Sequence, residues 1–195
     1  MAVARLGRGF FSRYTPEVAR DLLGCLIVRE TRGSRLSGRI VEAEAYRGSD
    51  DPASHSYRGA TKRNAMMFGE AGRAYVYFVY GNHWCLNFTT EEEGQPGAVL
   101  IRALEPVEGV ARMARNRGVD DLRSLTSGPG RLTEALSIGG SFNGEDAVTS
   151  KRLRVEGRAE PVEAGASTRV GVSSGREMRW RFFVVGNPFV SKGKA

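Results

Sequence analysis

Residues 74–88 read AYVYFVYGNHWCLNF, two apolar and aromatic runs separated by Gly81-Asn82. A two-residue hairpin turn needs positive φ, which this dipeptide adopts at little steric cost. We therefore expect residues 75–80 to pair with residues 83–88 across the turn. Such a hairpin belongs to an antiparallel sheet.

Alternation along the first strand divides its side chains between two faces. One face carries Tyr75, Tyr77 and Val79, and the other carries Val76, Phe78 and Tyr80. Tyr80 lies beside the turn and is the least easily buried of these. Two interpretations stay open: an aromatic-rich core hairpin with an amphipathic tip, or an aromatic wedge that enters a minor groove and replaces an unstacked base.

The composition narrows the class of protein. With 195 residues, 41% of them hydrophobic, the chain suits one domain spanning residues 1–195. Its 29 Lys and Arg residues against 22 Asp and Glu give a formal net charge of +7, which favours polyanionic partners without identifying them. The first 21 residues lack the apolar segment of a signal peptide, and no apolar run is long enough to span a membrane. We therefore expect a cytoplasmic protein with no membrane partner.

Signatures of metals and cofactors are missing from the sequence. Two cysteines and two histidines give no cluster at structural-zinc spacing, and a site built on His83 and Cys85 is the weaker alternative to two ordinary strand residues. The segment SGPGRL, residues 127–132, lacks P-loop spacing, and no GxGxxG motif opens a helix. We expect no metal and no cofactor.

Turn signals and periodicity predict the other elements. Thr15 as N-cap, Pro16 at the first helical position and Gly24 as a stop predict a helix over residues 16–23. Further helices are predicted at 106–117 and 131–137, and strands at 25–30, 39–46, 98–104, 151–156, 168–172 and 180–185. Residues 47–72 show no period, which is typical of a functional or disordered loop. The predicted class is α+β with a mostly antiparallel sheet and flanking helices.

Two glutamates, Glu42 and Glu44, share one face of the strand predicted at 39–46. One interpretation is an edge strand with that face in solvent. The other is a general base for a water molecule, kept charged by a partner such as Arg102. Tyr46 and His55 add flat rings nearby, which suggests a slot for a planar ligand.

Long motifs in fixed order carry a family resemblance. They are RIVEAEAYRGSDDPASHSYRG (39–59), RNAMMFGEAGRAYVYFVYGNHWCLNF (63–88), VLIRALEPVEG (99–109), SGPGRL (127–132) and RVGV (169–172). From about residue 7 to 191 the chain resembles the alkyladenine (3-methyladenine) DNA glycosylases of the non-helix-hairpin-helix type. The resemblance implies a single domain with a curved sheet and a protruding β-hairpin that inserts into the minor groove of double-stranded damaged DNA.

The resemblance also implies roles for particular residues. Glu44 is the implied base that activates water, with Arg102 and the backbone of Val170 holding that water. The implied walls around a flipped base are Tyr46, His55 and Tyr77, with Asn87 as the selectivity residue and Tyr80 as the intercalating residue. Lys62, where family members have proline, and His83-Trp84 after the turn depart from the family pattern, which puts the substrate range in doubt.

The implied reaction is hydrolysis of the N-glycosidic bond of a damaged purine. We expect a monofunctional enzyme without lyase activity, acting at the nucleoid if the source is bacterial. We also expect a monomer, because flipping a single nucleotide needs only one. An alkylated purine already carries positive charge, so it leaves as a neutral base, and one carboxylate suffices. Extruding the base costs a few kcal/mol, less for a damaged pair. Two alternatives remain: a non-catalytic nucleic-acid-binding module with an aromatic hairpin, and a bifunctional lyase with an amine nucleophile.

Overall fold

The computed structural model describes residues 4–79 and 81–192. Its strands are β1 (Leu26–Thr31), β2 (Ser34–Tyr46), β3 (Ala74–Val79), β4 (His83–Thr89), β5 (Ala98–Glu108), β6 (Leu153–Glu156), β7 (Ala164–Ser167) and β8 (Arg181–Val184). Its helices are α1 (Arg8–Phe11), α2 (Thr15–Asp21), α3 (Val110–Arg117), α4 (Leu122–Leu125) and α5 (Pro129–Ala135), with 3-10 turns η1 (Ala65–Phe68) and η2 (Gly140–Phe142). In this part of the chain no helix has both the length and the apolar character needed to cross a membrane.

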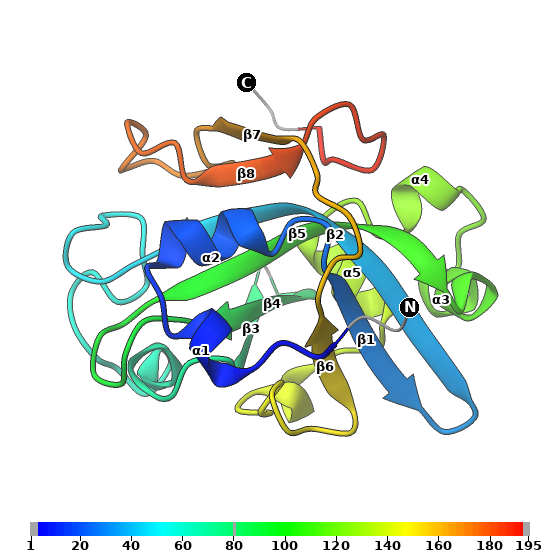
Figure 1. Ribbon diagram of the computed structural model, residues 1–195, viewed down its shortest axis with the longest axis horizontal. Coiled ribbons are helices and arrows are strands. Elements are labelled where there is room, and N and C mark those ends of the chain that lie inside the picture. The colour runs from blue at the N-terminus through cyan, green and yellow to red at the C-terminus, as the bar shows by residue number, and fades with distance from the viewer. Residues whose placement is uncertain (1–3, 80, 193–195) are drawn as a thin grey trace.

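β2 is the centre of the sheet. The strand order is β3-β4-β5-β2-β1-β6, β8 pairs with both β2 and β7, and all pairs are antiparallel. Register shifts on both sides of Glu42 mark a bulge, and bulges bend a strand and increase its twist. Figure 1 shows the sheet curled, with the β7–β8 pair at the top and the β1–β2 hairpin running to the lower right. The expected α+β class with a mostly antiparallel, curved sheet is confirmed.

The main core lies between this sheet and the helices. α2 lies across β2 and β5 (Figure 1) and buries Val18 and Ala19 completely, and Leu22 and Leu23 follow it into the same core. Phe11 of α1 packs against Phe88 of β4, with ring centroids 5.9 Å apart. α1 and α2 therefore pack on the sheet through one continuous hydrophobic core.

The hairpin is present, but its predicted register is wrong by one residue. Val79 pairs with His83 and Tyr75 with Asn87, whereas the predicted Gly81-Asn82 turn requires Tyr75 to pair with Phe88. The Asn82 N–H donates to the Val79 carbonyl at 3.4 Å, and Gly81 has φ +72°. The observed pairing, with a left-handed Gly81 between the strands, is an alternative hairpin that the same residues allow.

The helix predicted at 106–117 begins only at Val110. Pro106 stays in β5, where it pairs with Gly38, and the chain turns at Gly109 with φ +73°. A β-carbon at Gly109 would lie 2.7 Å from the Arg35 carbonyl oxygen, so close packing requires glycine there. Proline in a strand and proline at a helix start look alike in the sequence, because both positions tolerate a missing N–H.

The strand predicted at 168–172 does not form. β7 ends at Ser167, and the Val170 N–H donates to a side chain, Glu44 Oε1, at 2.7 Å instead of to a neighbouring strand. α5 lies two residues before its predicted position, β6 starts at Leu153, and α1 and α4 were not predicted. Residues 47–72 are irregular as expected, apart from η1.

The N-terminus of α2 is capped by a residue that is distant in the sequence. Thr15 was predicted as the N-cap but is the first helical residue, after Tyr14. Glu91 caps it instead: its Oε1 accepts from the Thr15 N–H at 2.8 Å, the Thr15 hydroxyl at 2.7 Å and Arg47 Nε at 3.0 Å. Glu91 is buried and has φ +66°, so the contacts offset the strain of a left-handed backbone.

Glu91→Ala should lower the free energy of unfolding by about 2 kcal/mol, because it removes the carboxylate that accepts from the Thr15 N–H, the Thr15 hydroxyl and Arg47 Nε. The backbone strain is unchanged, since alanine also carries a β-carbon. Urea denaturation measures the change, with the exposed neighbour in Glu93→Ala as a control that should stay within about 0.5 kcal/mol. Equal stability of the two variants would contradict the capping role.

Candidate active site

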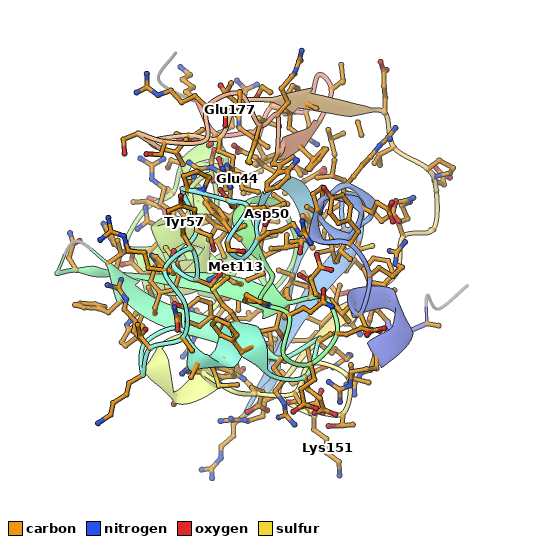
Figure 2. The ribbon with its side chains drawn as sticks, turned by 90° about the vertical axis from the view of Figure 1, so that its left-hand side faces the viewer. Glu44, Asp50, Tyr57, Met113, Lys151 and Glu177 are labelled. Carbon is orange, nitrogen blue, oxygen red and sulfur yellow. The ribbon has the colours of Figure 1, made fainter. Side chains whose placement is uncertain are left out.

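A cavity of about 730 Å³ opens between the β3–β4 hairpin, the loop after β2, the ends of β2 and β5, and the loop at 170–174. Six predicted site residues line it: Tyr46, His55, Tyr77, Asn87, Arg102 and Val170. Glu44 lies behind this lining and is hydrogen-bonded to three of its members. In Figure 2 the labelled Glu44 lies between Glu177 above and Asp50 and Tyr57 below. The fold thus brings together every predicted site residue of residues 4–79 and 81–192.

Glu44 is completely buried, yet both of its carboxylate oxygens have donors. Oε1 accepts from the Val170 N–H at 2.7 Å, and Oε2 accepts from the Tyr46 hydroxyl at 2.8 Å and Arg102 Nη1 at 3.4 Å. A carboxylate offers about four lone-pair sites, so these three donors leave one lone-pair site of the carboxylate unused.

The interpretation of a solvated edge strand is wrong. β2 is paired on both sides, and Glu42 is as completely buried as Glu44. Glu42 Oε1 accepts from Arg102 Nε at 3.2 Å and Arg181 Nε at 2.7 Å, and Oε2 accepts from the Ser191 N–H at 2.7 Å. Two buried carboxylates are therefore balanced by two arginines, the arrangement that burial of charge requires.

Arg102 joins the two glutamates. Burial opposes its charged form, but the charges of Glu44 and Glu42 outweigh that effect and raise the pKa of Arg102 above its ordinary value. Burial raises the pKa of Tyr46 as well, and the adjacent Glu44 adds to the rise. Tyr46 therefore remains a neutral hydrogen-bond donor to Glu44 at any physiological pH.

Aromatic rings form one wall of the cavity. The His55 ring lies 4.8 Å from the Tyr77 ring at 70°, and Tyr75 lies 5.1 Å from Tyr77. His55 Nδ1 and the Tyr75 hydroxyl are 3.1 Å apart. Burial lowers the pKa of His55, and the nearby Arg63 lowers it further. The wall is therefore uncharged at neutral pH and can face a planar, electron-poor ligand.

Asn87 completes this wall from β4. It is buried, and its Nδ2 donates to the Tyr75 carbonyl at 2.9 Å. That bond fixes the side chain at the cavity, because Tyr75 and Asn87 are also paired across the hairpin. Tyr80, predicted as an intercalating residue, lies outside the described residues.

The sequence reasoning missed a buried ion pair next to the cavity. Arg169 contacts Asp51 through two bonds, Nη1 to Oδ2 at 2.6 Å and Nη2 to Oδ1 at 2.7 Å, and both side chains are fully buried. Arg169 precedes Val170 in the RVGV motif, and Asp51 lies in the irregular loop. The two residues are 118 positions apart, so no local pattern connects them. The one signal in the sequence is that both lie inside the family motifs.

Within the described ranges, no group of three or more His, Cys, Asp or Glu side chains is arranged to hold a metal ion. His83 is exposed, and Cys85 is buried with a pKa raised by burial. Neither shares a cluster with other potential ligands.

Comparison with known proteins identifies the family. The family model described as methylpurine-DNA glycosylase matches residues 9–188. Curated relatives provisionally named 3-methyladenine DNA glycosylase include one from Chlorobium phaeobacteroides, 46% identical over 95% of both chains, and one from Koribacter versatilis, 48% identical over 97% of this chain and 94% of the relative. A relative with the same name from Methanoculleus marisnigri is 49% identical over 96% of this chain and 98% of its own.

The chain belongs to the methylpurine-DNA glycosylase family, as the motifs predicted. It is accordingly an enzyme of the DNA glycosylase class, a hydrolase of N-glycosyl bonds with a role in DNA repair.

His55 should titrate below its ordinary value of 6.5, because burial and Arg63 both oppose the imidazolium. As the pH falls, the unfolded chain therefore binds this proton before the folded chain does. The contribution of His55 to the free energy of unfolding decreases between pH 6.5 and the lower pKa of the folded state, and it does not change further below that pKa. Proton NMR of the ring measures the midpoint, with His83→Gln assigning the signals.

Arg63→Gln should move the His55 midpoint upward without restoring 6.5, since burial remains. Lys62→Gln, the neighbouring exposed cation, serves as the control and should leave the midpoint in place. A wild-type midpoint at or above 6.5 would contradict the account of the cavity wall.

Proposed function

We propose that this enzyme flips a damaged purine out of duplex DNA into the cavity and hydrolyses its N-glycosidic bond with a water molecule activated by Glu44, leaving an abasic site. The observation that carries the proposal is the position of Glu44: a buried carboxylate with ordered donors, directly behind a cavity lined by aromatic rings. In this mechanism the carboxylate activates water and the aromatic rings bind the flipped base.

In the proposed step, Glu44 takes a proton from water as the water oxygen bonds to C1′ of the sugar. The C1′–N bond breaks and its electron pair leaves with the base. A purine alkylated on a ring nitrogen becomes neutral on leaving, so no acid has to protonate it. The negative charge of Glu44 also stabilises the oxocarbenium-like transition state, and Arg102 and the backbone of Val170 hold the water.

The aromatic wall supports a cationic purine as the ligand. We propose that Tyr46, His55 and Tyr77 contact the flipped base and that Asn87 excludes the 2-amino group of guanine. The pKa of His55 is lowered, so its ring adds no competing charge, and the Tyr77 ring attracts an electron-poor base through its π face. Besides Arg102, three arginines line the cavity, and they suit the phosphates beside a flipped nucleotide: Arg63, Arg117 and Arg131.

We propose a monofunctional enzyme that works as a monomer in one domain, residues 1–195, and approaches from the minor groove. A bifunctional lyase needs an amine nucleophile, and the described residues that line the cavity include no lysine. A single flipped nucleotide needs one cavity only. A chromosomal substrate also favours action in the cytoplasm, at the nucleoid if the source is bacterial.

Glu44→Gln should slow excision by at least about 100-fold, because general base catalysis contributes about 10²–10⁴-fold. Its affinity for lesion DNA should stay near that of the wild type. The measurement is single-turnover excision from duplexes with one 7-methylguanine, hypoxanthine or ethenoadenine, followed by alkali cleavage and gel analysis, with Glu93→Gln as the control.

Full excision by Glu44→Gln would overturn the proposed role of Glu44. Strand breaks without alkali, or an adduct trapped by borohydride, would contradict the monofunctional reaction.

Tyr80→Ala should slow excision from duplex DNA by about tenfold, since stacking of an aromatic ring against bases is worth about 1–3 kcal/mol. The rate on the same lesion in single-stranded DNA should change little, because no gap in a duplex has to be filled. Tyr80→Phe keeps the ring and is the matched control. An equal loss on both substrates would contradict the wedge role.

A further inference from the structure

We propose that the buried Asp51–Arg169 ion pair is a positioning clamp that holds three walls of the cavity in register with Glu44. The inference rests on the proposed role of Glu44 as the base. Neither Asp51 nor Arg169 lines the cavity, so both act through the residues beside them.

Arg169 reaches the strand that carries Glu44. Its Nη1 donates to the carbonyl of Ala45 at 2.9 Å, between Glu44 and Tyr46 in the chain, while the same nitrogen bonds Asp51 at 2.6 Å. Its guanidinium also lies over the Tyr46 ring, 4.7 Å from the centroid. Arg169 thus fixes both the backbone and the ring at the end of β2.

Arg169 also fixes its own neighbour. The Val170 N–H donates to Glu44 Oε1 at 2.7 Å, and the next residues of this loop line the cavity. The segment has no strand partner of its own, since β7 ends at Ser167. The buried guanidinium therefore replaces the sheet as the anchor of the loop.

Asp51 organises the third wall. Its Oδ2 accepts from the Arg47 N–H at 3.0 Å, and its Oδ1 accepts from the Ala53 N–H at 3.0 Å. These bonds shape the turn between β2 and His55. The ion pair consequently ties the loop that carries His55 to the loop that carries Val170.

Stability alone does not explain this pair. Burying two charges carries a desolvation cost that often exceeds their attraction, and apolar residues of similar size commonly serve stability as well. Within the described part of the chain, the buried Nε of Arg169 has no hydrogen-bond partner, which adds to that cost. A planar, bidentate contact instead supplies fixed geometry, and a reacting group displaced by about 1 Å can lose about 100-fold in rate.

The test neutralises both partners together, so that no unpaired charge is left buried. Asp51→Asn keeps one of the two oxygens, which accepts from either the Arg47 N–H or the Ala53 N–H, and Arg169→Met keeps the length of the side chain. The control is Arg8→Met with Asp146→Asn, which removes a partly exposed bidentate Arg–Asp pair, with bonds of 3.1 and 2.7 Å, whose residues do not line the cavity.

Three quantities are measured for each variant: the midpoint of urea denaturation, the dissociation constant for lesion duplex, and the single-turnover rate of excision. We expect the Asp51→Asn/Arg169→Met variant to fold and to bind DNA like the control, but to excise about 100-fold more slowly. The control pair should keep the wild-type rate within about threefold. A loss confined to the chemical step is what positioning predicts.

A folded Asp51→Asn/Arg169→Met variant with the wild-type rate would overturn the inference. If that variant does not fold, Arg169→Lys is the test, because lysine keeps the positive charge but cannot make the bidentate contact of the guanidinium. A rate of excision reduced by about tenfold at unchanged DNA affinity supports the clamp, and an unchanged rate overturns it. Glu44→Gln in the same assays separates the two proposals. Its full activity would remove the proposed function, whereas an inactive Glu44→Gln beside a fully active clamp variant would remove the clamp alone.

Discussion

The burial of the Glu44 carboxylate is the constraint on which the rest of the structure depends. A carboxylate inside a sheet needs donors from several directions, because water cannot reach it freely. Here those donors come from β2 itself, from Arg102 on β5 and from the Val170 backbone. The buried carboxylate of Glu42 also needs donors, and it accepts from Arg181 of β8 and from the Ser191 N–H. The strands of the curled sheet and the segment after β8 are thus held together by the same charges that surround the candidate base.

The cavity lies between the β3–β4 hairpin and the strands that carry the buried charges. Alternation along β3 puts the rings of Tyr75 and Tyr77 on the cavity side, and β4 adds Asn87 on the same side. The irregular loop supplies His55, which burial keeps neutral. In the proposed function, the neutral aromatic rings beside a buried anion face a planar cationic base, and the arginines of the cavity face the phosphates. In the proposed function, the preference for alkylated purines and catalysis by one carboxylate both arise from this arrangement.

Local patterns in the sequence predicted much of the fold and less of the site. The hairpin, the central strand and the α+β class follow from alternation and turn residues, while the hairpin register was wrong because Gly81 allows more than one turn. Local patterning proposed Glu44 with Arg102, and the roles of Val170, Tyr77 and Asn87 came from the family motifs. The prediction of a strand at 168–172 was wrong, and the pairing of Asp51 with Arg169 was not predicted. Both have the same cause, because a contact between residues 118 positions apart leaves no local periodicity in the sequence.

The most direct test of the account is a crystal structure of the Glu44→Gln variant bound to a duplex with a single alkylated purine. The account predicts the purine between His55 and Tyr77, and a water molecule within about 3 Å of both the side chain at position 44 and C1′ of the flipped nucleotide. A purine that stays stacked in the duplex, or one in the cavity with C1′ turned away from position 44, would contradict the central claim that this buried carboxylate directs the attack of water.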